Sequence, residues 1–270
     1  MTRYSSLFLL GLLAAALPSC TKDSQSPAFD DQPVVEGYLV AGQPVHITIS
    51  RQIAASANVV YATDDINNLQ VFLIHNGISY PLQAQGNGVY TDSSLVIAEG
   101  ERYTLSFAYN QKTVTGTTSI PARPQNYSQS VSSISVEKMD STTGPPAGGF
   151  TRPDPVVLSW TNTDASYYMT VAQNLATNPE LIRDTTNRPL VTFRNEPGIE
   201  ETYSINSFQF AFFGQYRLVL FHLNPDYARL YGNNSNSSQN LTSPETTLQN
   251  GLGIFTGMST DTLFLEVLKK

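Results

Sequence analysis

Apolar and polar residues alternate with a period of two in several segments of this chain. Every second side chain is apolar in residues 45–49 and 103–109, and residues 35–39 follow the same pattern around a glycine. Successive side chains of a β-strand point to opposite faces of the sheet, so this alternation predicts half-buried strands. A chain patterned in this way folds into sheets that each cover a core with one face.

Two short turns join such strands into hairpins. Asn76-Gly77 lies between the runs QVFLIH and ISYPLQ, and both residues tolerate the positive φ that a two-residue type I′ turn requires. Asn110-Gln111 is a weaker turn signal between SFAY and KTVTGTT. With these turns, residues 33–120 contain about seven strands, the size of an immunoglobulin-like sandwich.

The segment IPARPQ, residues 120–125, carries two prolines and predicts a boundary between two domains. Further strand-like segments follow it, among them VVLSWTN, SYYMTVAQ, YRLVLFHL and DTLFLEV. One short helix is expected at residues 225–231, because Asn224 can cap it and Pro225 suits the first helical position. The second half therefore predicts another β-domain with little helix.

The composition agrees with β-structure and excludes other classes. Charged residues make up only 14% of the chain and aromatic residues 10%. A coiled coil would be rich in Ala, Glu, Lys and Leu, and a disordered chain would lack the aromatic residues. The net charge of −7 comes without a basic run, so the chain lacks the phosphate-neutralising residues of a nucleic-acid-binding protein. A soluble β protein with no nucleic-acid partner is expected.

The first twenty residues resemble an export signal that ends at a lipid-modified cysteine. Arg3 precedes an apolar run of eleven residues, 7–17, which at ~1.5 Å per residue is too short to cross a ~30 Å hydrocarbon core. LPSC follows, and Cys20 is the only cysteine in the chain. An ordinary signal peptide with a chance cysteine is the alternative. The position of this single cysteine favours a bacterial lipobox, in which the thiol is acylated and becomes the first mature residue.

A lipidated Cys20 would anchor the chain to a membrane through its acyl chains. The polar segment that follows has no apolar periodicity and is typical of a tether. The expected fold is all-β, with two β-sandwich domains, the first immunoglobulin-like and the second carrying one short helix. The expected organisation is a signal peptide at 1–19, a lipidated tether at 20–32, an N-terminal sandwich at 33–122 and a C-terminal β-domain at 123–270.

Several segments together resemble the domain of unknown function 4249 family, lipoproteins found mainly in Bacteroidota. The resemblance rests on the lipobox, PVVEGYL, VHITISR, LQVFLIHNG, GVYTDSSLVIAEGERYTLSF and LNPDYARLY, and most specifically on NGLGIFTG at residues 250–257. It departs from the family at NNSNSSQN, which is short and neutral. The resemblance implies an outer-membrane lipoprotein without an assigned reaction, whose relatives often accompany TonB-dependent outer-membrane β-barrel transporters.

The titratable residues form no recognisable catalytic motif. His46, His75 and His222 lie in strand-like segments without an HExxH spacing, and no GxSxG motif occurs. The adjacent carboxylates Asp64-Asp65 are typical of a solvated turn, and a Ca²⁺ site there would lack the DxDxDG spacing. We therefore expect a non-enzymatic protein without a metal or cofactor.

Aromatic residues crowd the second half of the chain. Phe208, Phe210 and Phe212 alternate, so they predict one buried face of a strand. Phe213 and Tyr168 would then point the other way, where they could face a ligand or a partner.

Loops commonly carry binding residues on a rigid scaffold, and Tyr and Arg dominate binding hot spots. The partner-binding candidates, in the long loop 51–68 and near the C-terminus, are Arg51, Tyr61, Asp64, Tyr227, Tyr231 and Phe255. The alternative for Tyr227 and Phe255 is a buried pair that holds the short helix against the second sheet. The leading function is a membrane-anchored binding or accessory module that partners a transporter. A surface adhesin or glycan-binding sandwich is the alternative, and a hydrolase has the least support.

Overall fold

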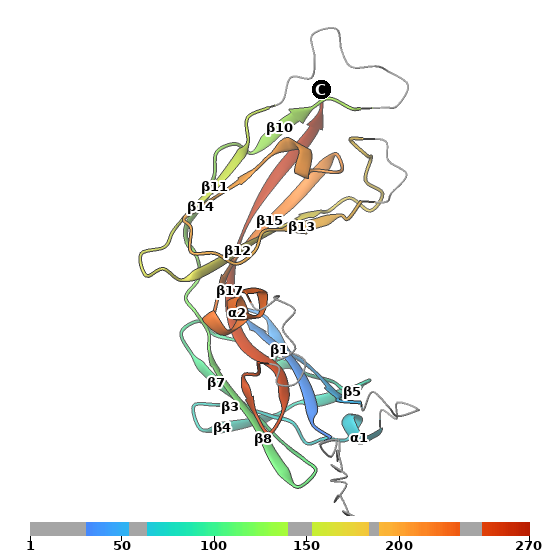
Figure 1. Ribbon diagram of the computed structural model, residues 1–270, viewed down its shortest axis with the longest axis vertical. Helices are drawn as coiled ribbons and strands as arrows, with labels where there is room; N and C mark the ends of the chain where they lie inside the picture. Colours follow the sequence, from blue (N-terminus) through green and yellow to red (C-terminus); the bar gives the residue numbers. More distant parts are fainter. Residues whose placement is uncertain (1–30, 54–63, 140–152, 184–188, 233–244) are drawn as a thin grey trace, which may run out of the picture. The chain divides into compact units, whose positions relative to one another are not determined.

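The computed structural model describes residues 31–53, 64–139, 153–183, 189–232 and 245–270. Within them the chain consists mostly of β-strands, with two short α-helices and one 3-10 turn (Figure 1). The strands form sandwich-like pairs of sheets, so the predicted all-β class is confirmed. None of the helices in these residues has the length and the apolar run needed to cross a bilayer.

Two sheets enclose a first core that is built mainly from the N-terminal half. One of them is the N-terminal part of a large sheet, with β1 (Pro33–Val40), β2 (Pro44–Arg51), β5 (Gln83–Gly86) and β6 (Val89–Val96). The other sheet has the order β16-β8-β7-β3-β4, with β3 (Phe72–His75), β4 (Ile78–Pro81), β7 (Arg102–Tyr109), β8 (Lys112–Ser119) and β16 (Leu248–Gln249). The short helix α1 (Asp64–Asn67) follows β2.

The C-terminal half encloses a second core. It contains β9 (Gln125–Gln129), β10 (Ser133–Val136), β11 (Val156–Thr161), β12 (Tyr167–Asn174), β13 (Thr192–Arg194), β14 (Thr202–Ile205), the 3-10 turn η1 (Ser207–Gln209), β15 (Gly214–Leu223), α2 (Pro225–Gly232) and β17 (Leu252–Lys269). The large sheet has the order β13-β12-β15-β17-β1-β2-β6-β5, with β10 also paired to β17, and a smaller sheet has the order β14-β11-β9.

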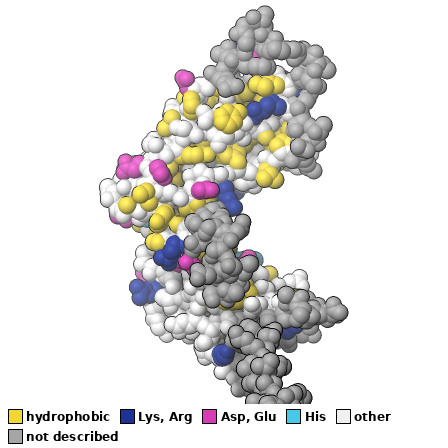
Figure 2. Space-filling model, in the orientation of Figure 1, with side chains coloured by type: hydrophobic (Ala, Val, Ile, Leu, Met, Phe, Trp, Pro, Cys, Tyr) yellow, Lys and Arg dark blue, Asp and Glu magenta, His cyan; other side chains and the backbone are white. Residues whose placement is uncertain are grey.

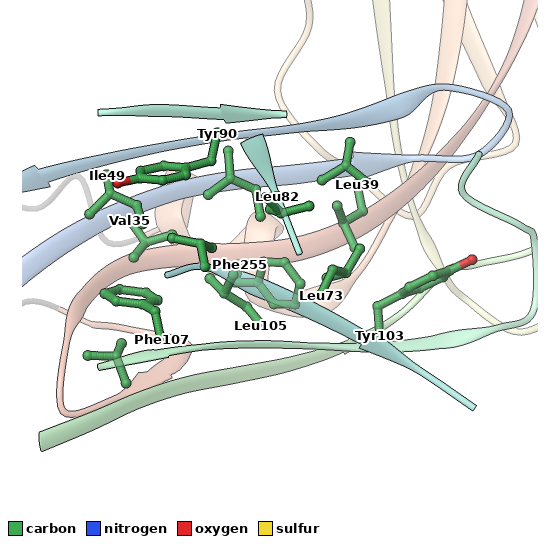
Figure 3. Close-up of a cluster of buried hydrophobic side chains, with 14 of the residues drawn as sticks. Val35, Leu39, Ile49, Leu73, Leu82, Tyr90, Tyr103, Leu105, Phe107 and Phe255 are labelled. Carbon is green, nitrogen blue, oxygen red and sulfur yellow. The ribbon is translucent and has the colours of Figure 1, made fainter. Parts of the chain in front are cut away.

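The predicted alternation produces the first core. On β1 and β2, Val35, Ile47 and Ile49 are fully buried, and Leu105 and Phe107 on β7 close the cluster from the facing sheet (Figure 3). The hairpin predicted at Asn76-Gly77 is present, with φ values of 50° and 77° at the two residues. The alternating strands and the Asn76-Gly77 hairpin are therefore present at the positions that the sequence predicts.

Strand β17 belongs to both cores. Residues 252–258 pair in parallel with β1, and residues 258–267 pair antiparallel with β15. As a result Leu248 and Phe255, which the sequence boundary placed in the C-terminal domain at 123–270, pack in the first core. The difference arises because a boundary drawn at prolines follows chain order, whereas the last strand returns to the first.

The proline-rich segment between the halves is fastened on both sides. The carbonyl oxygen of Ala122 accepts hydrogen bonds from His222 Nδ1 (2.7 Å) on β15 and Ser259 Oγ (2.6 Å) on β17. The next backbone N–H, of Arg123, donates to Glu99 Oε2 (3.0 Å) in the first half. These bonds tie the segment to both parts of the chain.

Candidate functional site

The partner-binding residues predicted from the sequence lie on several different elements. Arg51 ends β2 and is half-buried, Asp64 begins α1, and Tyr227 and Tyr231 lie in α2. Cys20 and Tyr61 lie outside the described residues.

Phe255 is a core residue and is not available to a partner. Its side chain is fully buried in the first core (Figure 3). The backbone of β1 approaches the ring so closely that a Cβ on Gly37 would lie 2.8 Å from Phe255 Cδ2. Its N–H donates to Thr247 Oγ1 (2.6 Å). The partner-binding role predicted for Phe255 is therefore wrong, because the parallel β1–β17 pairing encloses this residue.

Helix α2 is held against the strands beside it. The side-chain amide of Asn224, expected to cap the helix, donates to Thr118 Oγ1 (3.0 Å) and the Ser119 carbonyl oxygen (2.8 Å) on β8. The ring of Tyr227 lies edge-on to Tyr38, with centroids 6.0 Å apart, and packs on a small apolar cluster that contains Met258. Tyr227 thus contributes to holding the helix in place.

The end of the long loop 51–68 is fastened to the first core. Buried Tyr90 donates through its hydroxyl to the carbonyl oxygen of Ile66, and the Leu69 N–H donates to the same hydroxyl (3.0 Å). Burial raises the pKa of Tyr90. The Gly88 N–H also donates to Asn67 Oδ1 (2.7 Å). The end of this segment is therefore a structural anchor.

A cleft of about 570 Å³ in the C-terminal half is the strongest candidate site. Its volume is within the ~300–1,000 Å³ range of small-ligand sites. The cleft is lined by Arg183, Pro189, Leu190, Thr192, Phe193, Phe208, Gln209 and Ala211.

The floor of the cleft is a short pairing between two non-strand segments. The Ile182 N–H donates to the Ala211 carbonyl oxygen (2.9 Å). Beside this pair, Arg183 donates from Nη2 to the carbonyl oxygens of Phe208 and of Phe210, the latter at 3.1 Å. Because the guanidinium group is planar and offers several donors in fixed directions, these bonds fix its position at the edge of the cleft.

One wall of the cleft continues into the second core. Phe193 on β13 packs edge-to-face on the fully buried Phe210, with centroids 5.6 Å apart and rings at 75°. Phe210 packs in turn on Tyr216, with centroids 4.9 Å apart. The Tyr216 hydroxyl donates to the Phe212 carbonyl oxygen (3.1 Å), and burial raises the pKa of Tyr216. The wall at Phe193 is therefore backed by the core.

The orientation predicted for the aromatic residues 208–213 is wrong at two positions. Phe208 is 58% exposed and Phe213 is buried. The segment is not a strand there, because η1 interrupts it. The Gln209 N–H donates to the Asn206 carbonyl oxygen (3.0 Å), and the Asn206 N–H donates to Gln209 Oε1 (2.8 Å). The spacing of Asn206 and Gln209, typical of a capped helical start, is the signal that would have indicated this turn. Tyr168, also expected to face outward, is buried in the second core.

Exposed apolar side chains border the cleft. Leu190 is 82% exposed, more than any other large apolar residue that the structure describes, and Phe208 lies beside the same opening. Figure 2 shows more hydrophobic side chains over the C-terminal half of the visible face than over the N-terminal half. Contiguous apolar surface of this kind marks binding sites in soluble domains.

A comparison with the profiles of known protein families finds a match over most of the chain. The profile of the family described as Domain of unknown function (DUF4249) matches residues 21–263. The chain belongs to the DUF4249 family. This confirms the resemblance stated from the motifs, and the matched range includes the whole cleft of this DUF4249 chain. A comparison with curated proteins gives no match.

The histidines of this DUF4249 chain lie on three different strands of the described part. In it, no group of three or more His, Cys, Asp or Glu side chains could hold a metal ion. His46, His75 and His222 lie on β2, β3 and β15, and the His75 ring stacks on Tyr103. Among the described residues that line the cleft, Arg183 is the one ionisable side chain. Sequence reasoning missed Arg183, because no motif surrounds it.

Proposed function

We propose that this DUF4249 chain is a non-enzymatic binding or accessory module, anchored in the outer membrane through acyl chains on Cys20, that captures cargo for a TonB-dependent β-barrel transporter. The observation that carries this proposal is the cleft between Arg183 and Phe208, with exposed Leu190 at its opening. A rigid floor and exposed apolar rim suit the binding of a ligand.

The cleft lining favours binding over catalysis. General acid–base catalysis needs a group that gains and loses a proton near neutral pH. An arginine side chain stays protonated in proteins, and of the described lining residues only Thr192 and Gln209 have other polar side chains. Gln209 already donates through Nε2 to the Tyr203 hydroxyl (3.0 Å). These residues can orient a bound molecule without transforming it.

The anchor rests on the N-terminal sequence. An acylated Cys20 would be followed by the polar residues 21–32, and β1 begins at Pro33. A stretch of this length reaches at most roughly 45 Å when fully extended. Such a tether would let the module present its cleft to a neighbouring membrane protein without leaving the membrane surface.

Co-purification tests this function. The full lipoprotein, solubilised in mild detergent, should recover a β-barrel transporter that mass spectrometry identifies. Replacement of residues 54–63 by a Gly/Ser linker, which keeps the core contacts of Ile66 and Asn67, should reduce recovery if the loop with Tyr61 contacts the transporter. Recovery of no β-barrel by the parent protein would contradict the accessory role.

Glycan binding is a second candidate, which the exposed aromatic rings favour. Phe208 and Phe264 are 58% and 50% exposed, and sugar-binding sandwiches use exposed rings to stack on pyranose faces. Selective binding to a glycan array, lost in Phe208→Ala, would support this role over transport.

A further inference from the structure

One of the described residues that line the cleft is charged. Among its described lining residues, Arg183 carries a positive charge and no carboxylate opposes it. Both hydrogen bonds given above for its side chain leave from Nη2. Within the described part of the chain, the N–H groups of Nε and Nη1 have no hydrogen-bond partner and remain as donors for a ligand. Both parallel pairs of N–H groups on a guanidinium group include Nη2, so a ligand carboxylate would accept a single charge-assisted hydrogen bond from Nε or from Nη1, which is stronger than a bond between neutral groups.

The rest of the lining suits an apolar body. Phe193, Phe208 and Leu190 supply two aromatic rings and an aliphatic side chain, and aromatic pairs gain stability from offset or edge-to-face packing. Phe193 is held by its contact with Phe210. The ligand would therefore meet a wall that is already ordered, which lowers the entropy cost of binding.

We propose that the cleft binds a small apolar monocarboxylate, with its carboxylate on Arg183 and its aromatic or aliphatic body between Phe193 and Phe208. This inference rests on the proposed function and names the chemical class of the cargo. An organic cation would be repelled by Arg183. A neutral apolar molecule would cover the guanidinium group without giving it a partner, which is costly. A highly charged anion would meet apolar walls on most sides.

Titration calorimetry with two matched probes tests the proposal. The full mature lipoprotein in lipid nanodiscs is titrated with 3-phenylpropanoate and with its neutral isostere 3-phenylpropanamide. The two probes share the ring and differ in charge. The acid should bind about tenfold more tightly or better, the range expected for hydrogen bonds to a charged partner.

Variants locate the binding. Arg183→Gln should remove the preference for the acid, and Phe208→Ala should weaken both probes by a similar factor. The matched controls are Arg217→Gln, on β15, and Ile199→Ala, whose side chain is 51% exposed. Both residues lie outside the cleft, so both variants should keep the affinities of the parent for the two probes. Arg183 also donates to the carbonyl groups of Phe208 and Phe210. The melting temperature of the Arg183→Gln variant is therefore measured together with its affinities. The exposed Phe208 gives a variant that does not depend on that role.

Each outcome decides the proposal. Equal affinities for acid and amide, no binding of either probe by the folded parent, or unchanged binding in Phe208→Ala would each overturn it. The proposed function fails separately: a protein that binds the acid but recovers no β-barrel keeps this inference and loses the transporter partnership. A protein that recovers the β-barrel but binds neither probe keeps the transporter partnership and loses this inference.

Discussion

Phe208 and Phe210 are separated by one residue, yet Phe208 is 58% exposed at the rim of the cleft and Phe210 is fully buried beneath it. The 3-10 turn η1 places them on different sides of the same segment. The guanidinium group of Arg183 donates to the backbone carbonyl oxygens of both residues and so holds the segment between them in place. The proposed ligand contact and the core packing therefore fall on nearby residues that can be changed separately.

Alanine at these two positions should lower the free energy of unfolding by very different amounts. Phe210→Ala removes a ring that packs on Phe193 and Tyr216, and should lower the free energy of unfolding by about 3–5 kcal/mol. Phe208→Ala removes an exposed ring and should change it by less than about 0.5 kcal/mol. Urea denaturation of both variants checks this pair. Similar losses in the two would mean that Phe208 also supports the core.

Glycine at position 253 should be required by space as well as by conformation. Gly253 has φ +94°, and a Cβ there would lie 2.2 Å from the Val35 carbonyl oxygen in the β1–β17 pairing. Gly42 is the control, with φ +76° and nothing within 4 Å of its added Cβ. Gly42→Ala should cost roughly 1–2 kcal/mol of strain. Gly253→Ala should cost about 3 kcal/mol or more, because the added methyl group also displaces β1. Equal losses in the free energy of unfolding would show that the close approach is unimportant.

Stability should fall at alkaline pH. Burial raises the pKa of Tyr127 and of Tyr216, and for Tyr127 the nearby Asp261 raises it further. Both tyrosines are neutral below their ordinary pKa of 10.0 in the folded and the unfolded chain. Above that pH the unfolded chain loses these protons first, so the stability present below pH ~10 declines as the pH rises toward the folded-state pKa. Urea denaturation from pH 8 to pH 11 measures the decline. Tyr127→Phe should make it shallower, and an unchanged slope would contradict the assignment.

Cys20 should be the site of lipid attachment. Cys20→Ala should leave an unacylated precursor that is not stably held in the outer membrane, because the acyl chains provide the anchor. Palmitate labelling and membrane fractionation measure this. A variant that still takes up the label and stays in the outer membrane would refute the lipobox assignment.

Local features of the fold could be predicted from the sequence. The alternation in β1, β2 and β7 depends on neighbouring residues, and so does the positive φ of Asn76-Gly77. The helix at residues 225–231 was also recognisable from local signals and is present as α2. Each of these features follows from a few adjacent side chains.

Features that join distant segments could not be predicted. The parallel pairing of β1 with β17 brings Gly37 beside Phe255, and no pattern in either strand specifies that partner. The cleft depends on Arg183 reaching the backbone of Phe208. Such a contact joins residues 25 positions apart in the chain, and a period-two pattern carries no information about it.

Native mass spectrometry of the lipoprotein purified from the cell that makes it tests the central claim most directly, because it requires no assumption about the ligand. The parent protein, released from gentle detergent, should carry a small-molecule adduct. Phe208→Ala should lose the adduct, and Ile199→Ala should keep it. A parent protein that carries no adduct, or an adduct that persists in Phe208→Ala, would contradict the assignment of the cleft as the binding site.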